Sequence, residues 1–155
     1  MARLSSPTPR IVRGRVFVDT GAIIGRLNPD DAHRTSVLAA WSQIDDEVMV
    51  TSDLVLVEAL NHTAGRSRSL RQAMQAFVGA IMGSSSWKVT PFGRLGFTDA
   101  LKRYGSPGVG RALQPSLVDA HIHDLMISQG IHRILTVDAY FEHMGMTNLV
   151  DLHRR

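Results

Sequence analysis

The chain has 155 residues, a length that suits one folded domain, and 44% of them are hydrophobic, which is enough for a substantial core. It contains no cysteine, which excludes disulfides, thiolate zinc sites and cysteine nucleophiles and fits a reducing cytoplasm. No run of 18 apolar residues occurs, so we expect no membrane-spanning helix. The formal net charge of +3 comes mainly from arginine, which permits a nucleic-acid partner but fits an arginine-rich proteome equally well.

Two polar stretches are expected to lie outside regular structure. Residues 1–14, MARLSSPTPRIVRG, carry arginines but no apolar central region, so they do not read as a secretory signal. We expect them to form a flexible basic leader, followed by a single domain over residues 15–155. The segment GSPGVGRALQP, residues 105–115, contains three glycines and two prolines, which predicts a long mobile loop.

The rest of the chain alternates short β-branched runs with longer stretches of helical period. In chain order, strands are expected at residues 16–18, 48–51, 87–90, 134–137 and 149–150. Helices are expected between them, at residues 32–44, 54–62, 70–82, 97–104 and 117–129. Strands that alternate with helices predict an α/β layer fold around a mostly parallel sheet.

Four acids stand out because apolar sequence surrounds each of them. Asp19 ends the first strand, Glu58 lies within LVLVEALNH, Asp119 begins a helix in PSLVDAHIHD, and Asp138 ends the strand ILTVD. In open α/β sheets, functional groups gather at the carboxyl ends of the strands, so we expect these acids to converge there. A carboxylate cluster without a lysine needs a cation, and its hard oxygen ligands suit Mg²⁺ or Mn²⁺. Such a site favours metal-assisted attack on a phosphodiester.

Each acid also has a purely structural explanation. Asp19 and Asp138 are candidates for the N-caps of the helices that follow their strands, and Asp119 completes a capping box with Ser116. Glu58 is free to pair with an arginine or to point outward. These explanations account for each residue type but not for four acids at one edge of a sheet.

Other chemistries find less support in the sequence. His121 and His123 lie two residues apart, which places them on different faces of a helix and disfavours a zinc site. A phosphatase of the haloacid dehalogenase type needs a second acid at position 21, where Gly21 stands. The phosphate-binding patterns GxxxxGK[ST] and GxGxxG are absent.

Four pieces of the sequence occur in the order of a known family: VFVDTGAIIG, TSDLVLVEALNH, PSLVDAHIHDLM and ILTVDAYFEHMGMTNL. Over residues 15–150 the chain resembles PIN-domain proteins, in particular the VapC-like ribonuclease toxins of toxin–antitoxin pairs. The resemblance implies a three-layer α/β/α sandwich with a mostly parallel central sheet. It also implies a catalytic pocket of Asp19, Glu58, Asp119 and Asp138 that cleaves RNA with Mg²⁺ or Mn²⁺, with the metal on Asp19, Asp119 and Asp138.

The same resemblance assigns supporting roles to other residues. Thr20 and Thr136 match hydroxyl positions beside the pocket, and Arg66, Arg68 and Arg71 are expected to contact RNA phosphates. A cognate antitoxin that covers the acidic groove and a homodimer are implied as partners, with the helices at 32–44 and 54–82 as interface candidates. The alternative function is a catalytically silent module of the same fold that binds RNA or protein.

The chain departs from the family pattern in two places. The basic leader is longer than these toxins often carry. In addition, Tyr140 stands where some relatives have a further acid, two residues after Asp138, which leaves four acids for the metal and Glu142 as a poor candidate for a fifth.

Overall fold

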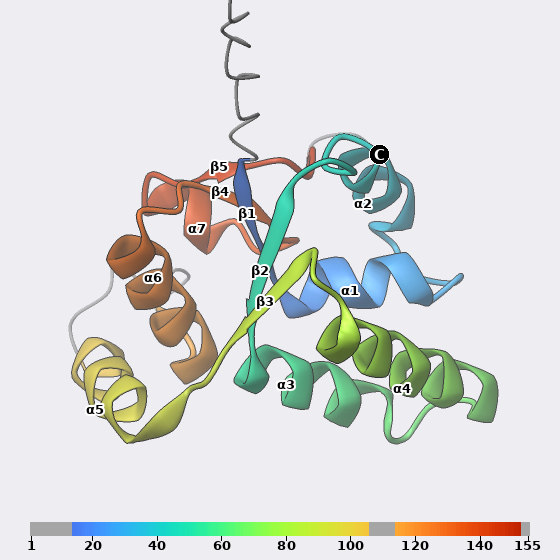
Figure 1. The fold of residues 1–155 in the computed structure, drawn as a ribbon, viewed down its shortest axis with the longest axis horizontal. Coiled ribbons are helices and arrows are strands. Elements are labelled where there is room, and N and C mark those ends of the chain that lie inside the picture. The colour runs from blue at the N-terminus through green and yellow to red at the C-terminus, as the bar shows by residue number, and fades with distance from the viewer. Residues whose placement is uncertain (1–13, 106–113, 153–155) are drawn as a thin grey trace, which may run out of the picture.

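The structure is a computed structural model that describes residues 14–105 and 114–152 (Figure 1). The predicted leader, apart from Gly14, and most of the predicted loop at 105–115 lie outside these ranges. The described elements are β1 (Arg15–Val18), α1 (Thr20–Leu27), α2 (Arg34–Trp41), β2 (Val48–Ser52), α3 (Asp53–Thr63), α4 (Arg68–Gly83), β3 (Trp87–Thr90), α5 (Gly93–Tyr104), α6 (Leu117–Gln129), β4 (Arg133–Leu135), α7 (Tyr140–His143) and β5 (Thr147–Asn148).

The five strands form one sheet in the order β3-β2-β1-β4-β5, and every neighbouring pair is parallel. The central strand β1 reads Val16-Phe17-Val18, and all three side chains are fully buried, as expected of a parallel strand covered on both faces. Helices α5, α6 and α7 lie on one side of the sheet and α1, α2, α3 and α4 on the other (Figure 1). The predicted three-layer α/β/α sandwich is therefore confirmed.

The bounds of two strands differ from those predicted from the sequence. The strand expected at 134–137 stops at Leu135, because the Asn148 side chain forms hydrogen bonds with the backbone of Thr136. Asn148 Oδ1 accepts from Thr136 N at 3.3 Å, and Asn148 Nδ2 donates to Thr136 O at 3.0 Å. The last strand is Thr147–Asn148 and not 149–150. Helices α1 and α7 were expected only as the helices that follow Asp19 and Asp138, and no ranges were predicted for them. α1 carries two glycines, which lower helix propensity, and α7 has only four residues.

Gly21, in the first turn of α1, packs directly on the segment that follows β4. A Cβ at this position would come within 2.3 Å of the Val137 side chain. There is no room for the second acid of the phosphatase motif, which agrees with its absence from the sequence. Within the described ranges, no helix has both the length and the apolarity that crossing a bilayer requires.

Candidate functional site

Strand pairing brings the first and last acids of the set to the carboxyl edge of the sheet. β1 and β4 are parallel neighbours with Val18 opposite Leu135, and the Asp19 N–H donates to Leu135 O at 3.0 Å. Asp19 follows β1 directly, and Asp138 lies three residues after Leu135. Because parallel strands end at one edge, acids that follow β1 and β4 share that edge.

Asp19 is a buried carboxylate with only 6% of its surface exposed. Its Oδ1 accepts from Thr20 N at 2.6 Å and its Oδ2 accepts from the Thr136 hydroxyl at 2.7 Å. The pKa of Asp19 is raised to about 7, mainly by burial and to a smaller extent by the charges of Asp119 and Glu58, while its two hydrogen bonds oppose the increase. The predicted N-cap role is confirmed, since Asp19 caps α1.

Glu58 reaches the site from the middle of α3. The Thr20 hydroxyl, in the first turn of α1, donates a hydrogen bond to Glu58 Oε2. Thr20 therefore connects two acids, through its backbone N–H to Asp19 and through its hydroxyl to Glu58. The predicted position of Thr20 beside the pocket agrees with this arrangement.

Asp119 stands in the first turn of α6 as the third residue of a complete capping box. Ser116 Oγ accepts from Asp119 N at 3.1 Å, and Asp119 Oδ2 accepts from Ser116 N at 2.9 Å and from the Ser116 hydroxyl at 2.8 Å. Partial burial raises the pKa of Asp119, and the charges of Asp138 and Glu58 add to the increase. The capping explanation is thus correct for Asp119 as well, yet the neighbouring acids act on it electrostatically.

Asp138 is exposed and oriented by the backbone around it. Its Oδ1 accepts from Tyr140 N at 2.8 Å, and its own N–H donates to the Thr136 hydroxyl at 3.0 Å. Thr136 thereby contacts both Asp19 and Asp138. Glu142, the poor fifth candidate, accepts from Asn148 Nδ2 at 3.2 Å and is not hydrogen-bonded to the four acids.

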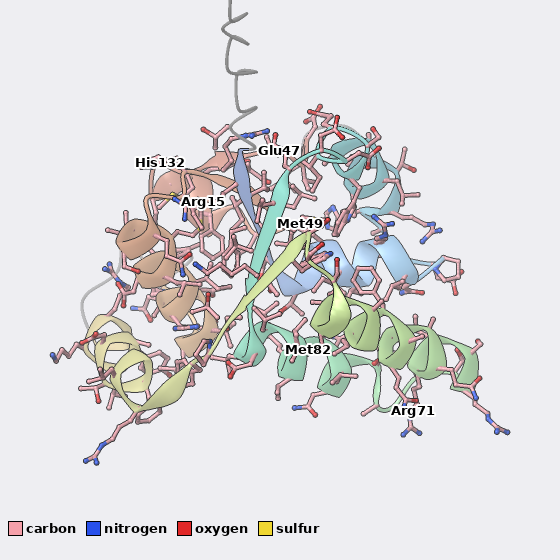
Figure 2. The ribbon with its side chains drawn as sticks, viewed as in Figure 1. Arg15, Glu47, Met49, Arg71, Met82 and His132 are labelled. Atoms are coloured by element: carbon pink, nitrogen blue, oxygen red, sulfur yellow. The ribbon has the colours of Figure 1, made fainter. Side chains whose placement is uncertain are left out.

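No cation neutralises this acidic edge within the described ranges. Ion pairs occur elsewhere, as at the amino edge of the sheet, where Arg133 Nη1 lies 2.6 Å from Glu47 Oε1. Figure 2 labels Glu47 at that upper edge, beside Arg15 and His132. The carboxylate oxygens fit the ligand preference of a hard divalent cation. As the side chains stand, however, no three Asp, Glu or His residues of the described chain converge closely enough to hold a metal ion. The metal set of Asp19, Asp119 and Asp138 therefore stays a prediction.

The three predicted RNA-binding arginines lie together, away from the sheet. Arg66, Arg68 and Arg71 line a groove of about 850 Å³ between α3 and α4, and all three are exposed. None of them forms an ion pair with a described residue. Figure 2 shows Arg71 projecting from α4 away from the sheet.

The two histidines of α6 do not form a metal site with the described acids. His121 Nε2 lies 3.1 Å from Ser52 Oγ, and its ring packs on Phe92 with a centroid distance of 4.5 Å. His123 is buried, and its Nδ1 has no hydrogen-bond partner in the described chain. Burial lowers the pKa of both rings, so both are packing residues that favour the neutral form.

Tyr140 is the residue near the acids whose position the sequence did not reveal. It is 6% exposed, and burial raises the pKa of its phenol, with the charges of Asp119 and Asp138 adding to the increase. Arg103 acts in the opposite direction and pairs with Asp124, its Nε lying 2.6 Å from Asp124 Oδ1. The sequence pointed to Tyr140 only because it stands where some relatives have a further acid. No sequence pattern indicated that Arg103 of α5 would lie near the carboxyl edge of the sheet.

A family model described as PIN domain matches residues 16–145. The chain belongs to the PIN domain family. Among solved structures, this PIN domain is similar to VapC20 of Mycobacterium tuberculosis, a toxin that cleaves the sarcin–ricin loop. The TM-score is 0.70 with 24% identity, over 85% of this chain and 96% of that chain, and at this identity the likeness concerns the fold. A comparison with curated protein sequences found no match.

Proposed function

We propose that the protein is an endoribonuclease that depends on Mg²⁺ or Mn²⁺ and hydrolyses RNA phosphodiesters, with residues 15–155 as its single nuclease domain. The observation that carries the proposal is the set of mutually interacting carboxylates Asp19, Glu58, Asp119 and Asp138, which no described lysine or arginine neutralises. A bound cation would stabilise such neighbouring carboxylates as anions. Membership of the PIN domain family and the fold shared with an RNA-cleaving toxin support the same activity.

Asp19, Asp119 and Asp138 are the residues that would hold the metal, with Glu58 completing the catalytic set. When bound, the ion supplies a Lewis acid that neutralises charge on the phosphate and favours deprotonated water. The chain itself orients the carboxylates: Thr136 and the Thr20 N–H hold Asp19, and the Thr20 hydroxyl holds Glu58.

Each of the three remaining acids keeps an oxygen available at the site. Asp119 is hydrogen-bonded through Oδ2, Asp138 through Oδ1 and Glu58 through Oε2, and their second oxygens receive no hydrogen bond from the described chain. In Asp119, the cap and the metal functions therefore do not compete for the same atom. The N-cap role predicted for Asp138 is wrong, because the N-cap of α7 is Ala139.

The exposed arginines Arg66, Arg68 and Arg71 are proposed to attract the RNA backbone. Their groove lies beside α3, the helix that carries Glu58, and their charges are not consumed by ion pairs with described residues. Phosphate contacts of this kind supply affinity without reading sequence.

We further propose that this nuclease is the toxin of a type II toxin–antitoxin pair, acts in the cytoplasm and forms a homodimer. A basic side chain of an antitoxin would complement the negative charge of the unpaired acids at the interface. The exposed apolar residues Val57 on α3 and Met82 on α4 support a dimer interface at the predicted helices, and Figure 2 labels Met82. Sedimentation of the purified protein at micromolar concentration tests the dimer, and a single monomer species would contradict it.

The nuclease activity is tested by incubating purified protein with single-stranded RNA and Mg²⁺ or Mn²⁺. We expect endonucleolytic products, their loss when a chelator is added, and their return when the metal is restored in excess. Cleavage that continues in the chelator would contradict metal dependence. A protein that binds RNA without cutting it under any of these conditions would instead support the silent-module alternative.

A further inference from the structure

A cavity of about 770 Å³ lies beside the last two turns of α5 and the residues that lead into α6. Phe97, Leu101 and Tyr104 line its α5 side, and their spacing of four and three residues puts them on one face of the helix. The side chains of Phe97 and Tyr104 are 44% and 57% exposed. An exposed stripe of this kind marks a surface that contacts a ligand.

The rest of this aromatic cavity is lined by the mixed polar and apolar segment Gln114, Pro115, Ser116 and Leu117, which joins the acidic site. The Ser116 hydroxyl donates to Asp119 Oδ2 at 2.8 Å. Ser116 therefore lines the aromatic cavity and is also hydrogen-bonded to Asp119, one of the four acids. A nucleic acid with a phosphate at these acids would carry its adjoining nucleotide past Ser116 into the cavity.

The formal charge of α5 is positive, although ion pairs neutralise part of it. The helix carries Arg94, Lys102 and Arg103 against a single acid, Asp99, which gives three positive charges less one, or +2, over twelve residues. Lys102 and Arg103 stand in the last turn, but Lys102 lies 3.5 Å from Asp99 and Arg103 lies 2.5 Å from Asp124 of α6, so ion pairs occupy both charges. Exposed aromatic side chains are surfaces on which the bases of single-stranded nucleic acid stack, and here they adjoin the acidic site through Ser116.

We infer that the aromatic cavity binds an unpaired nucleobase of the RNA, next to the phosphate at the four acids, with Tyr104 as the stacking surface. The inference rests on the proposed function, because it takes RNA as the substrate. Phe97 is braced by Phe92, with ring centroids 6.0 Å apart, and forms the fixed end of the cavity. The Gln114 amide presents donors and an acceptor to the base edge, and the Ser116 hydroxyl, which donates its proton to Asp119, presents only an acceptor.

The test measures binding of a short, labelled single-stranded RNA by fluorescence anisotropy with Ca²⁺ in place of Mg²⁺, so that a cation that takes oxygen ligands neutralises the acids, and a gel of each sample verifies that the probe is intact. An abasic strand with the same backbone serves as the second probe. Replacing Tyr104 with alanine should weaken binding of the base-bearing strand about tenfold, the size of one base–aromatic stack, and change binding of the abasic strand by less than about twofold. Tyr104→Trp should restore the preference for bases.

The matched control is Leu95→Ala, since Leu95 is 82% exposed on the same helix but does not line the aromatic cavity. This variant should bind both probes like the wild type. An equal loss of affinity for the two probes in Tyr104→Ala would overturn the inference, as would no loss at all or no binding of RNA by the wild type. If Tyr104→Ala changes only the sedimentation of the protein, the cavity is an interface between two copies and the inference is wrong.

A separate cleavage assay with the same RNA and Mg²⁺ distinguishes a failure of the nucleobase site from a failure of the proposed nuclease activity. Cleavage combined with base-independent binding would overturn the nucleobase site and leave the nuclease standing. Base-dependent binding through Tyr104 without cleavage would support the nucleobase site and contradict the nuclease.

Discussion

The Thr136 hydroxyl donates a hydrogen bond of 2.7 Å to Asp19 Oδ2, linking the residue after β4 to the acid that ends β1. The same hydroxyl accepts from the Asp138 N–H at 3.0 Å. A single buried side chain thus fixes one acid and the backbone of another. The position of the acidic edge depends on this contact as well as on strand pairing.

Thr136→Val should destabilise the protein by about 1–3 kcal/mol, because a buried carboxylate oxygen and a backbone N–H would both lose their partner. Thr136→Ser keeps the hydroxyl and should cost less. Urea unfolding of the three proteins at one pH measures the difference in the free energy of unfolding. A valine variant as stable as the wild type would contradict the role assigned to this hydrogen bond.

The pKa of Asp19 predicts how stability depends on pH in metal-free protein. The unfolded chain ionises Asp19 near its ordinary value of 3.8, whereas the folded protein does so at about 7. Between these values the folded state holds the extra proton, so its stability relative to the unfolded chain falls as the pH rises from about 4 to above 7. The loss amounts to at most about 4 kcal/mol, and the raised pKa of Asp119 acts in the same direction.

Replacing Asp19 with asparagine should flatten this pH dependence, since the side chain no longer titrates. Denaturant unfolding of wild type and Asp19→Asn at pH 5 and pH 8 in a chelator provides the comparison. We expect the wild type to lose more stability than the variant between the two pH values. Equal changes in both proteins would contradict the pKa given to Asp19.

Divalent metal should bind at the acidic edge with a measurable heat. Isothermal titration of Mn²⁺ into the protein should give a binding signal that Asp138→Asn weakens strongly, because one charged ligand is lost. The control is Asp46→Asn, which removes an exposed acid from the turn before β2, at the other end of the sheet. A heat signal that both variants lose equally, or that neither loses, would remove Asp138 from the metal set.

The arginine groove should contribute salt-dependent affinity for RNA. Arg68→Ala and Arg71→Ala should each weaken binding, and the slope of log affinity against log salt should fall by about 0.7 per lost contact on a single strand. Lys88→Ala removes an exposed charge from β3, outside the groove, and is the matched control. If the control changes the slope as much as the arginine variants do, the effect comes from net charge and not from the groove.

The sequence was sufficient for the elements whose side chains repeat with one clear period. The apolar run Val16–Val18 predicted the central strand, and the period of residues 117–129 predicted α6 with its observed bounds. Capping chemistry is equally local, so the box formed by Ser116 and Asp119 could be predicted as well.

Contacts between distant segments could not be predicted in the same way. Asn148 ends β4 early by bonding to Thr136, and Gly21 is required by the close approach of Val137, but neither partner is near in sequence. The sequence predicted that the acids lie at the carboxyl edge of the sheet, but not how their side chains are arranged there. The oxygen atoms that each capping side chain uses depend on its conformation, which cannot be derived from the periodicity of the sequence.

The most direct measurement of the central claim is the rate of RNA cleavage by Asp119→Asn beside the wild type and Asp46→Asn. Asparagine keeps the oxygen that accepts from Ser116 but removes the charge, and an unchanged melting temperature would show that the cap is intact. We predict that Asp119→Asn cleaves at least about a hundredfold more slowly than the wild type in saturating Mg²⁺, while Asp46→Asn cleaves normally. Cleavage by Asp119→Asn at the wild-type rate would contradict the account.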